Sequence, residues 1–394
     1  MLLEKIKMLS EKYFVETQGY RHHLHSNPEL SFQEFETSKY IQEQLKSMGI
    51  PFEIKANTGI VALLKGKNAD KKTVALRADI DALPIQETNE VSYKSKNAGV
   101  MHACGHDVHT SSLLTALKIL NELKDSFDGT VKGIFQPAEE KLPGGASIMI
   151  KEGALENPRP ASIVGQHVMP LIECGKVGFR SGKYMASTDE LYIKVIGKGG
   201  HGAMPHLNID PVLIASHMIV ALQQVVSRSA DPKMPSVLSF GKVIANGATN
   251  VIPNEVYIEG TFRTLDEDWR AKAHEIMSSM AKGLVESMGG KLEFEIRKGY
   301  PFLVNDPETT ENARLAAIEY LGDENVVDLD IWMAAEDFAF YSQVMPATFY
   351  RLGTGNKSKG ITASVHTPNF DIDENALKHS PGLMAWIALK QLRV

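Results

Sequence analysis

Apolar positions in the first part of the chain alternate between helical spacing and short runs. Residues 2 to about 25 carry apolar side chains on one helix face, and Asn27-Pro28 ends this pattern. Further helical patterns cover residues 33–48 and 111–123. Between the helices lie short runs with the composition of β-strands, at residues 60–64, 73–76, 131–135 and 162–165. Strands interspersed with helices predict an α/β layer structure.

Near residue 185 the pattern changes to that of a smaller α+β unit. Six elements follow in the order strand, helix, strand, strand, helix, strand, at residues 191–196, 211–227, 237–244, 255–263, 269–288 and 291–297. This order is typical of the ferredoxin-like split motif, an antiparallel sheet with two helices on one face. The earlier pattern then resumes, with a strand at 347–352. We therefore expect one domain formed by residues 1–184 and 298–394, with a second domain inserted at 185–297.

Composition and charge narrow the class of protein. Of 394 residues, 43% are hydrophobic and 23% are charged, which is ordinary for a globular protein in water. A net charge of −6 gives no reason to expect nucleic acid or an anionic membrane as a partner. No stretch reads as a signal peptide or as long and apolar enough to cross a bilayer. The only cysteines are Cys104 and Cys174, so we expect no disulfide framework and a cytoplasmic location.

The densest run of metal-competent side chains is residues 101–109, Met-His-Ala-Cys-Gly-His-Asp-Val-His. Its Cys104 and His106 offer a thiolate and an imidazole, which bind zinc-like ions strongly, and Gly105 lets the backbone turn between them. The run leads into the predicted helix at 111–123, whose amino end would favour the thiolate form of Cys104. Two alternatives stay open: a structural cysteine beside ordinary loop histidines, or a cysteine nucleophile paired with His106.

Acidic and histidine side chains follow three of the predicted strands, namely Asp79, Asp81, Glu139, Glu140 and His167. In open α/β sheets, sites form beyond the carboxyl ends of the strands, so these segments would deliver their side chains to one edge. Of the two glutamates, one could bind metal while the other takes a proton from water. Taken alone, the glutamates could instead be an exposed acidic pair, and the aspartates part of a turn.

Isolated histidines are weaker signals. His366 lies in a loop, where a single histidine is usually not a metal ligand. His22, His23 and His25 look like a metal-binding tract, but successive positions of a helix face different directions. We therefore expect structural or solvated roles for these three.

Eight stretches carry a resemblance to a known family, namely Asn27-Pro-Glu-Leu-Ser-Phe32, Leu76-Arg-Ala-Asp-Ile-Asp-Ala-Leu-Pro-Ile85, Met101–Thr110, Phe135-Gln-Pro-Ala-Glu-Glu140, Gly197-Lys-Gly-Gly-His-Gly-Ala-Met-Pro-His206, Asn250-Val-Ile-Pro253, Gly260-Thr-Phe-Arg263 and Ala335-Glu-Asp-Phe338. Together they resemble the M20 family of metallopeptidases, in its amidohydrolase branch (subfamily D). That branch includes hippurate hydrolases, N-acyl amino acid deacylases and plant hydrolases of auxin–amino acid conjugates. The stretches run in the family's order over nearly the whole chain.

The resemblance implies a zinc-exopeptidase-like fold, with a mixed sheet flanked by helices, in the domain formed by 1–184 and 298–394. It implies two divalent cations per chain, zinc or manganese, with nickel and cobalt as alternatives. The implied metal ligands are Cys104, His106, Glu140, His167 and His366. Cys104 would bridge the two ions, and Glu139 would be the general base. Asp79 and Asp81 would orient the ligands rather than bind metal.

The resemblance also implies a role for the inserted domain as a lid that carries a homodimer interface. His201, supplied by the partner subunit, would donate to the oxyanion of the tetrahedral intermediate, with His206 as a helper. Asn250 and Arg263 would hold the carboxylate of the substrate, for which the planar fork of arginine is suited.

The expected activity is hydrolysis of the amide bond of a small N-acyl amino acid by metal-activated water. One alternative is a dipeptidase or carboxypeptidase that uses the same dinuclear centre. Another is a non-catalytic protein that binds metal or a ligand, although such a protein has no need of a spare base beside the ligand Glu140.

Overall fold

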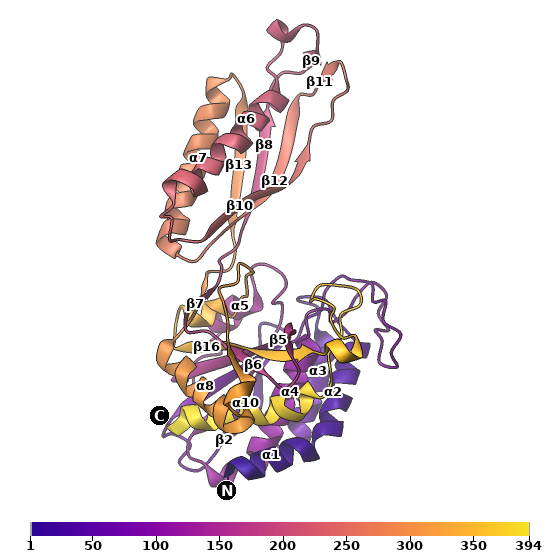
Figure 1. Ribbon diagram of the computed structural model, residues 1–394, viewed down its shortest axis with the longest axis vertical. Helices are drawn as coiled ribbons and strands as arrows, with labels where there is room; N and C mark the ends of the chain where they lie inside the picture. Colours follow the sequence, from indigo (N-terminus) through magenta and orange to yellow (C-terminus); the bar gives the residue numbers. More distant parts are fainter. Residues whose placement is uncertain (1, 394) are drawn as a thin grey trace. The chain divides into compact units, whose positions relative to one another are not determined.

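The computed structural model describes residues 2–393 and divides the chain into two compact units (Figure 1). Unit 1 comprises Met1–Lys183, Val304–Asp330 and Asp337–Val394, and unit 2 comprises Tyr184–Leu303 and Ile331–Glu336. Unit 2 is therefore an insertion into the chain of unit 1, joined later by a short second segment.

Unit 1 is built on a mixed sheet of eight strands. In spatial order they are β1 (Phe52–Lys55), β2 (Gly59–Lys65), β4 (Thr130–Gln136), β3 (Thr73–Asp79), β5 (Ser162–Glu173), β16 (Ala347–Gly355), β6 (Val177–Phe179) and β15 (Val326–Asp328). The neighbours β4, β3, β5 and β16 are parallel, whereas β1 and β2 join the sheet antiparallel. The four central strands therefore share one carboxyl edge, where sites form in such sheets.

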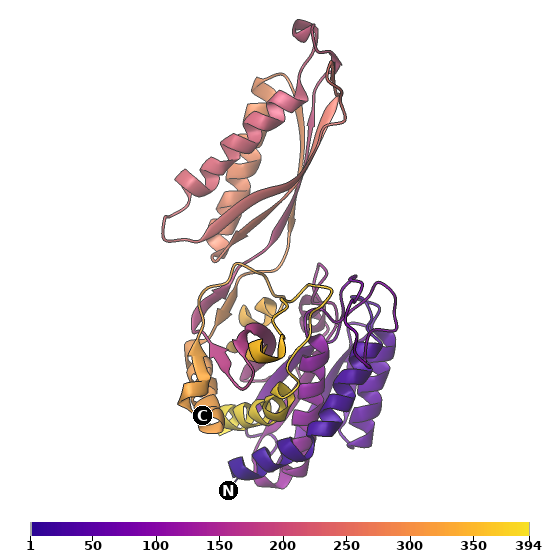
Figure 2. The same ribbon diagram turned by 45° about the vertical axis from the view of Figure 1, so that its right-hand side comes forward.

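Helices flank this sheet (Figures 1 and 2). They are α1 (Leu2–Lys12), α2 (Phe14–Ser26), α3 (Phe35–Ser47), α4 (His106–Glu122), α5 (Gly145–Lys151), α8 (Pro307–Leu321), α9 (Ala339–Ser342) and α10 (Ala376–Arg393). Helices α4 and α10 pack against each other and against β3. Every residue of β3, β4 and β16 is buried, as expected of parallel strands that are covered by helices. The predicted α/β fold with a mixed, helix-flanked sheet is confirmed.

Unit 2 has a four-stranded antiparallel sheet in the order β10 (Ser236–Ile244), β12 (Glu255–Thr264), β8 (Asp189–Ile196) and β13 (Lys291–Lys298). Two helices, α6 (Pro211–Gln224) and α7 (Glu267–Ser287), pack on this sheet. Buried and partly buried residues alternate strictly along β8, because one face meets the helices. This is the strand order of the ferredoxin-like split motif.

The remaining short elements join or extend these units. They are the strand pairs β7 (Gly182–Met185) with β14 (Leu303–Asn305) and β9 (Gly200–His201) with β11 (Val251–Ile252), the 3-10 turns at Lys124–Ser126, Pro205–Leu207, Asp323–Asn325 and Lys357–Lys359, and a π-turn at Val225–Ser229.

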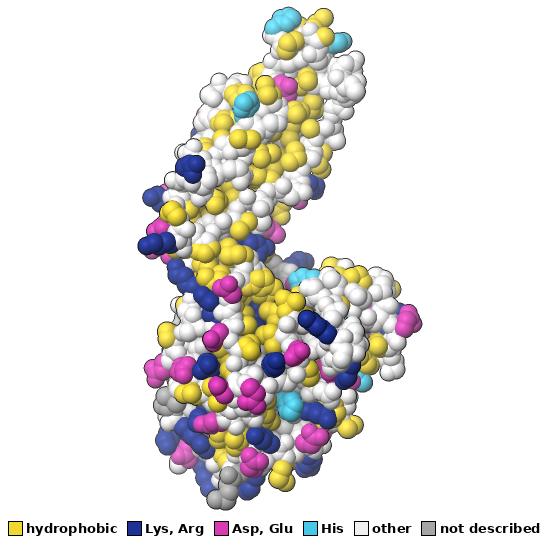
Figure 3. Space-filling view, in the orientation of Figure 1, with side chains coloured by type: hydrophobic (Ala, Val, Ile, Leu, Met, Phe, Trp, Pro, Cys, Tyr) yellow, Lys and Arg dark blue, Asp and Glu magenta, His cyan; other side chains and the backbone are white. Residues whose placement is uncertain are grey.

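Exposed apolar side chains gather on unit 2, where Figure 3 shows a broad hydrophobic area. On α6 and β10 they are Val212, Leu213, Val220, Val243 and Ile244, with exposures of 37–73%. We call this set the α6–β10 surface. A contiguous apolar patch on a protein in water commonly marks an interaction site.

One helix, Pro211–Ser229, has the length and apolar composition of a membrane span, and 28% of that stretch is buried. The expectation that no stretch meets these criteria is therefore wrong. The buried positions of α6, among them Ile214, Met218 and Leu222, pack into the core of unit 2. The helix thus combines a core face with the exposed α6–β10 surface, which accounts for its apolar composition.

Several predicted elements begin or end elsewhere in the structure. The helix predicted at 111–123 begins at His106, so His106 and His109 lie in its first turn rather than in a loop. Strand β3 extends to Asp79, and β5 extends past His167. The amphipathic N-terminal stretch is two helices that meet at Tyr13.

Candidate metal centre

Three potential metal ligands from separate elements converge at the carboxyl edge of the central strands. Cys104 lies two residues before His106, the first residue of α4, and His167 lies in β5. Their ligand atoms all lie within 4.8 Å of one another, and all three side chains are buried. The distance between Cys104 Sγ and His167 Nε2 is 3.4 Å.

A second group shares the same thiol. Cys104, Glu140 and His366 also have ligand atoms within 4.8 Å of one another. His366 Nε2 lies 3.3 Å from Cys104 Sγ and 3.2 Å from Glu140 Oε1. The structure therefore brings together all five residues implied as ligands, and Cys104 is the member common to both groups.

The tautomers of two histidines direct a lone pair at the thiol. His106 Nδ1 lies 2.9 Å from the Asp81 carbonyl oxygen and 3.1 Å from its carboxylate, so this nitrogen carries the proton. His167 Nδ1 likewise donates to the carbonyl of Val168 at 2.8 Å. The neutral His167 ring therefore presents an unprotonated Nε2, the form in which imidazole binds a metal, and His106 would present its Nε2 in the same way once a cation displaces the proton there. Among residues 2–393, the buried Nε2 of His106 has no hydrogen-bond partner.

His109 is close to the cluster but is fully engaged elsewhere. Its Nε2 accepts the backbone N–H of Val168 at 2.9 Å, so its Nδ1 carries the proton and donates to Asp79 at 2.6 Å. Asp79 also accepts a charge-assisted hydrogen bond from the buried Arg77. These contacts fit an orienting role for Asp79 and leave His109 without a free lone pair.

Asp81 connects two of the candidate ligands. One carboxylate oxygen faces His106 Nδ1, and the other accepts the Glu140 backbone N–H at 3.0 Å and the Ser31 hydroxyl at 2.7 Å. The His106 ring keeps the pKa of Asp81 below its ordinary value, although burial alone would raise it. An ionised Asp81 therefore holds the ring of His106 and the backbone at Glu140 in one arrangement.

The cluster carries more negative charge than the protein alone neutralises. Burial, together with the carboxylates of Glu140 and Glu139, raises the pKa of the Cys104 thiol well above its ordinary value. Burial lowers the pKa of His106, but the Asp79 and Asp81 carboxylates raise it to about 10. In the metal-free protein, burial and these carboxylates therefore disfavour the thiolate of Cys104 and oppose the effect of the helix terminus. A divalent cation would reverse both effects, and this donor set suits one.

Glu139 is buried beside this cluster, and its carboxylate shares the 4.8 Å group with those of His106 and Glu140. Glu34 holds the preceding turn, since its carboxylate accepts the backbone N–H of Ala138 at 2.9 Å and the Thr58 hydroxyl at 2.9 Å. Ala138 has a left-handed backbone with φ of 50°, which this clamp helps to stabilise. Burial and the nearby Asp81 carboxylate raise the pKa of Glu34 to about 6.

The other predicted site residues lie in unit 2, in two separate places. His201 pairs with Val251 in the antiparallel β9–β11 strand pair, and Gly202 N–H donates to the carbonyl of Asn250 at 2.8 Å. The Ala203 N–H donates to His201 Nδ1 at 3.1 Å, so the neutral ring carries its proton on Nε2. His206 is exposed in the neighbouring 3-10 turn.

Arg263 lies near the end of β12 that is remote from the β9–β11 strand pair. At about 3.3 Å per residue, the strand from Glu255 to Arg263 spans roughly 25 Å. Arg263 Nη1 donates to the carbonyl of Met333 at 3.2 Å, and burial lowers the pKa of the guanidinium. No carboxylate among residues 2–393 forms an ion pair with it. A single unit 2 therefore does not bring Arg263 together with His201 and Asn250.

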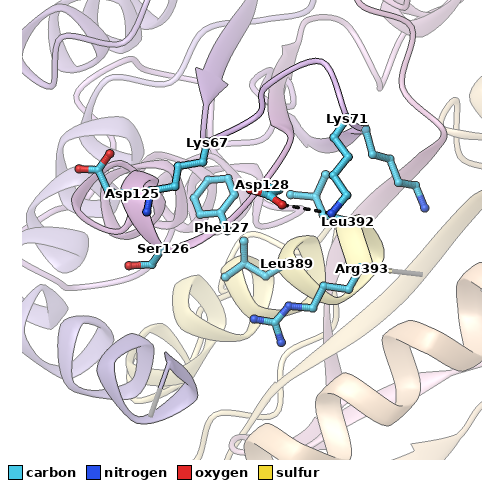
Figure 4. Close-up of a pocket in the computed structure, with 10 residues that line it drawn as sticks. Lys67, Lys71, Asp125, Ser126, Phe127, Asp128, Leu389, Leu392 and Arg393 are labelled. Carbon is cyan, nitrogen blue, oxygen red and sulfur yellow. Dashed lines mark hydrogen bonds and ion pairs between the residues drawn. The ribbon is translucent and has the colours of Figure 1, made fainter.

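A hollow of about 610 Å³ lies away from these groups (Figure 4). Its walls include Lys67, Phe127 and Arg393, and Lys71 pairs with Asp128 at 3.1 Å. These residues lie near the amino ends of β3 and β4, whereas the ligand cluster lies at the carboxyl edge. The hollow is therefore not the candidate centre.

Sequence reasoning missed several buried charged residues that support the centre. Besides Glu34, Asp337 accepts hydrogen bonds from Arg77 at 2.8 Å and from the Ala146 N–H at 3.0 Å. Arg21 ion-pairs with Asp107, the residue after His106, at 3.1 Å. Asp337 and Arg77 lie within the stretches that carry the family resemblance, which is the only signal that could have identified them. Nothing local in the sequence indicates their partners.

Comparison with known proteins gives a consistent result. The sequence profile of peptidase family M20/M25/M40 matches residues 75–388. The N-acyl-L-amino acid amidohydrolase of Geobacillus stearothermophilus is 43% identical over 309 residues, covering 78% of this chain and 83% of that protein. Thermostable carboxypeptidase 2 of Saccharolobus solfataricus is 38% identical, covering 94% of both chains. A solved Bacillus subtilis structure, described as a dinuclear metal binding peptidase from the M20 family, superposes with a TM-score of 0.83 at 35% identity, covering 97% of this chain and 99% of that one.

Proposed function

The chain belongs to peptidase family M20/M25/M40, and on this premise we propose that it hydrolyses the amide bond of small N-acyl amino acids. The observation that carries the proposal is the convergence of two ligand groups on one thiol, with the carboxylate of Glu139 beside them. The chain is a metal-dependent amide hydrolase that holds two cations. The substrate and the role of each residue are proposed here.

We assign Cys104, His106, Glu140, His167 and His366 as the residues that would hold the two cations, with Cys104 shared by both ligand groups. When bound, the cations polarise the scissile carbonyl and lower the pKa of water toward neutrality. The tautomers of His106 and His167 support this assignment, because their Nδ1 protons are already engaged and their Nε2 atoms face the cluster. Asp79 and Asp81 orient these rings from behind.

Glu139 acts as the general base. It accepts a proton from the attacking water and then delivers that proton to the nitrogen of the leaving amine, so that the C–N bond breaks with a neutral leaving group. Its buried position limits access of bulk water, and the Glu34 clamp fixes the turn that presents it. Glu140, although adjacent in sequence, faces His366 and serves as a ligand instead.

In unit 2, His201 donates its Nε2 proton to the oxyanion of the tetrahedral intermediate, with His206 close by. Asn250 and Arg263 hold the carboxylate of the substrate. Arg263 suits this role because it is half-buried and has no carboxylate partner among the described residues. We assign residues 185–297 as the lid and dimerisation domain that carries these groups.

A homodimer follows from the spacing within unit 2. Asn250 and Arg263 are separated by the length of β12, roughly 25 Å, which exceeds the size of any small N-acyl amino acid. Two subunits can supply Asn250 and Arg263 to one substrate if the β9–β11 strand pair of each subunit, with His201 and Asn250, reaches the metal centre of its partner. The exposed α6–β10 surface offers the apolar area that such an interface needs.

We propose zinc or manganese as the physiological metal. A bridging thiolate favours the softer zinc, whereas the carboxylates that surround the site also suit manganese, with nickel and cobalt as further candidates. We place the enzyme in the cytoplasm, because both Cys104 and Cys174 are free thiols.

A carboxypeptidase activity is the second candidate, because one close relative carries that name and because Arg263 would recognise the free carboxylate of a peptide equally well. A parallel assay of N-acetyl amino acids, N-benzoyl amino acids and dipeptides separates the two activities.

The deciding experiment compares Glu139→Gln with Glu140→Gln, two isosteric changes at adjacent positions. Glu139→Gln should keep two tightly bound cations and lower kcat by about 100-fold or more, the usual contribution of a general base. Glu140→Gln should lose metal. Near-normal turnover of Glu139→Gln, or full metal content in Glu140→Gln, would contradict the assigned roles.

A further inference from the structure

Arg21 of α2 is buried completely, yet its guanidinium contacts three carboxylates that come from distant parts of the chain. Its Nε donates to Asp107 at 3.1 Å, its Nη2 to Asp371 at 2.6 Å and its Nη1 to Glu374 at 2.9 Å. The ring of Tyr93 lies 5.0 Å from the guanidinium and completes its surroundings. A buried charge with this many partners is costly to desolvate, which points to a specific role.

The three carboxylates belong to two of the segments that carry the proposed metal ligands, those of His106 and His366. Asp107 directly follows His106 in the first turn of α4, whereas Asp371 and Glu374 lie on the segment that follows His366. We propose that Arg21 is a positioning residue that fixes His366 relative to Cys104 and His106, and thereby sets the geometry of one of the two cation sites. This inference rests on the dinuclear centre proposed above.

His366 needs such support because its side chain is half exposed and its backbone conformation is unfavourable. Its side chain is 51% exposed, and its backbone is left-handed with φ of 62°, a conformation that costs a non-glycine residue free energy. Its backbone N–H donates to the carbonyl of Ala103 at 2.7 Å. That bond fixes one point of the loop, and Thr88 N–H and the Asn89 side chain donate to the carbonyls of Pro368 and Phe370, each at 2.8 Å. The anchor at Asp371 and Glu374 fixes its other end.

Apart from the proposed ligand Glu140, which lies 3.2 Å from His366 and 3.9 Å from His106, Arg21 is the side chain among residues 2–393 whose ion pairs join both segments. His25 bonds to Asp107 at 2.8 Å but not to the segment after His366, and His22 bonds to Glu374 at 2.6 Å but not to α4. Without the guanidinium, the carboxylates of Asp107 and Asp371 would repel each other, and the two segments would separate. A lysine at this position offers one ammonium and does not reproduce the three-way fork.

The test compares Arg21→Met with Arg270→Met. Arg270 is the matched control, because it is also a fully buried arginine and pairs with Asp189 at 2.6 Å and Glu267 at 3.0 Å, but within unit 2. Both variants should unfold at a lower temperature when metal-free. Only Arg21→Met should lower the affinity for one of the two zinc ions, by about 10- to 100-fold, as is typical when a group that orients a ligand is removed.

Zinc affinity is measured by competition with a chromophoric chelator, and cobalt substitution reports the thiolate-to-metal absorption band at Cys104. The proposal is overturned if Arg21→Met binds both ions as tightly as wild type while losing as much thermal stability as Arg270→Met. If Arg21→Met does not fold, Asp371→Asn replaces it, since this change removes one arm of the fork at a partly exposed carboxylate. Unchanged zinc affinity in Asp371→Asn likewise overturns the proposal. Wild-type protein that binds fewer than two ions would instead refute the dinuclear centre itself.

Discussion

Gly105 permits a steric test of how the metal-binding loop is held. It lies between Cys104 and His106 with φ of 81°, and a Cβ at this position would lie 2.5 Å from Cγ2 of Val168. The left-handed backbone alone costs an alanine about 1–2 kcal/mol. Overpacking against Val168 adds about 1–3 kcal/mol, so Gly105→Ala should lose about 2–5 kcal/mol in total.

The consequences should extend to the metal centre. Val168 accepts a hydrogen bond from His167 Nδ1 through its carbonyl and donates its N–H to His109. Displacement of Val168 by the new methyl group therefore rotates a proposed ligand. We expect zinc affinity to fall by about 10- to 100-fold, the range seen when ligand orientation is lost.

Gly49 provides the control, because it has φ of 67° and a Cβ added there would meet nothing within 4 Å. Gly49→Ala should incur only the backbone cost of about 1–2 kcal/mol and keep wild-type zinc affinity. Calorimetry of metal-free protein measures the stabilities, at about 2–4 °C per kcal/mol for a domain of this order of size.

A double-mutant cycle isolates the clash. Val168→Ala removes both Cγ atoms, so adding Gly105→Ala in that background should cost no more than Gly49→Ala does in wild type. The reasoning is refuted if Gly105→Ala is no more destabilising than Gly49→Ala, or if Val168→Ala leaves the excess cost unchanged.

Three further outcomes are expected. Burial lowers the pKa of Lys132 to about 8 from 10.5, so its charge destabilises the fold below pH 8 and this cost disappears as the pH rises toward 10.5. In urea unfolding, wild type should therefore gain about 2 kcal/mol relative to Lys132→Met over that range, after allowance for partial solvation. Asp81→Asn should lower zinc affinity by about 10- to 100-fold in chelator competition, with unchanged affinity contradicting its orienting role. Val220→Glu should convert a dimer to a monomer in light scattering, whereas Val15→Glu, at an equally exposed valine (75% against 73%), should not.

The elements of the inserted unit and the central strands of the larger sheet could be predicted from the sequence, because hydrophobic periodicity survives in them, whereas α5, α8 and α10 received no predicted range. The residues at which several elements begin and end could not be predicted. Asp79 and His167 were expected just beyond strands but lie within β3 and β5, since polar side chains at the carboxyl edge can continue a strand whose backbone is paired on both sides. The start of α4 at His106 was missed because the first turn of that helix is made of ligand and polar residues without apolar periodicity.

The ligand set was implied by motif resemblance, and the structure brings its five members together. The pKa shifts and long-range ion pairs of the site could not be predicted from the local sequence. Burial raises the pKa of the Cys104 thiol, and Glu140 and Glu139, which are remote in sequence, raise it further. The ion pairs of Arg21 likewise connect α2 to the C-terminal part of the chain. Long-range pairs of this kind leave no local pattern, so His25 could be given a structural role but not its partner Asp107.

The thiol of Cys104 and the imidazole of His366 are 262 residues apart in the chain. A ribosome that adds about 5–20 residues per second needs roughly 13–50 s to travel between them. Throughout that interval the nascent polypeptide displays a cysteine and a histidine that can hold a cation only loosely. On the assignment proposed above, one of the two groups of metal ligands is complete only after His366 has been synthesised, so a chain truncated before His366 should lack that cation site.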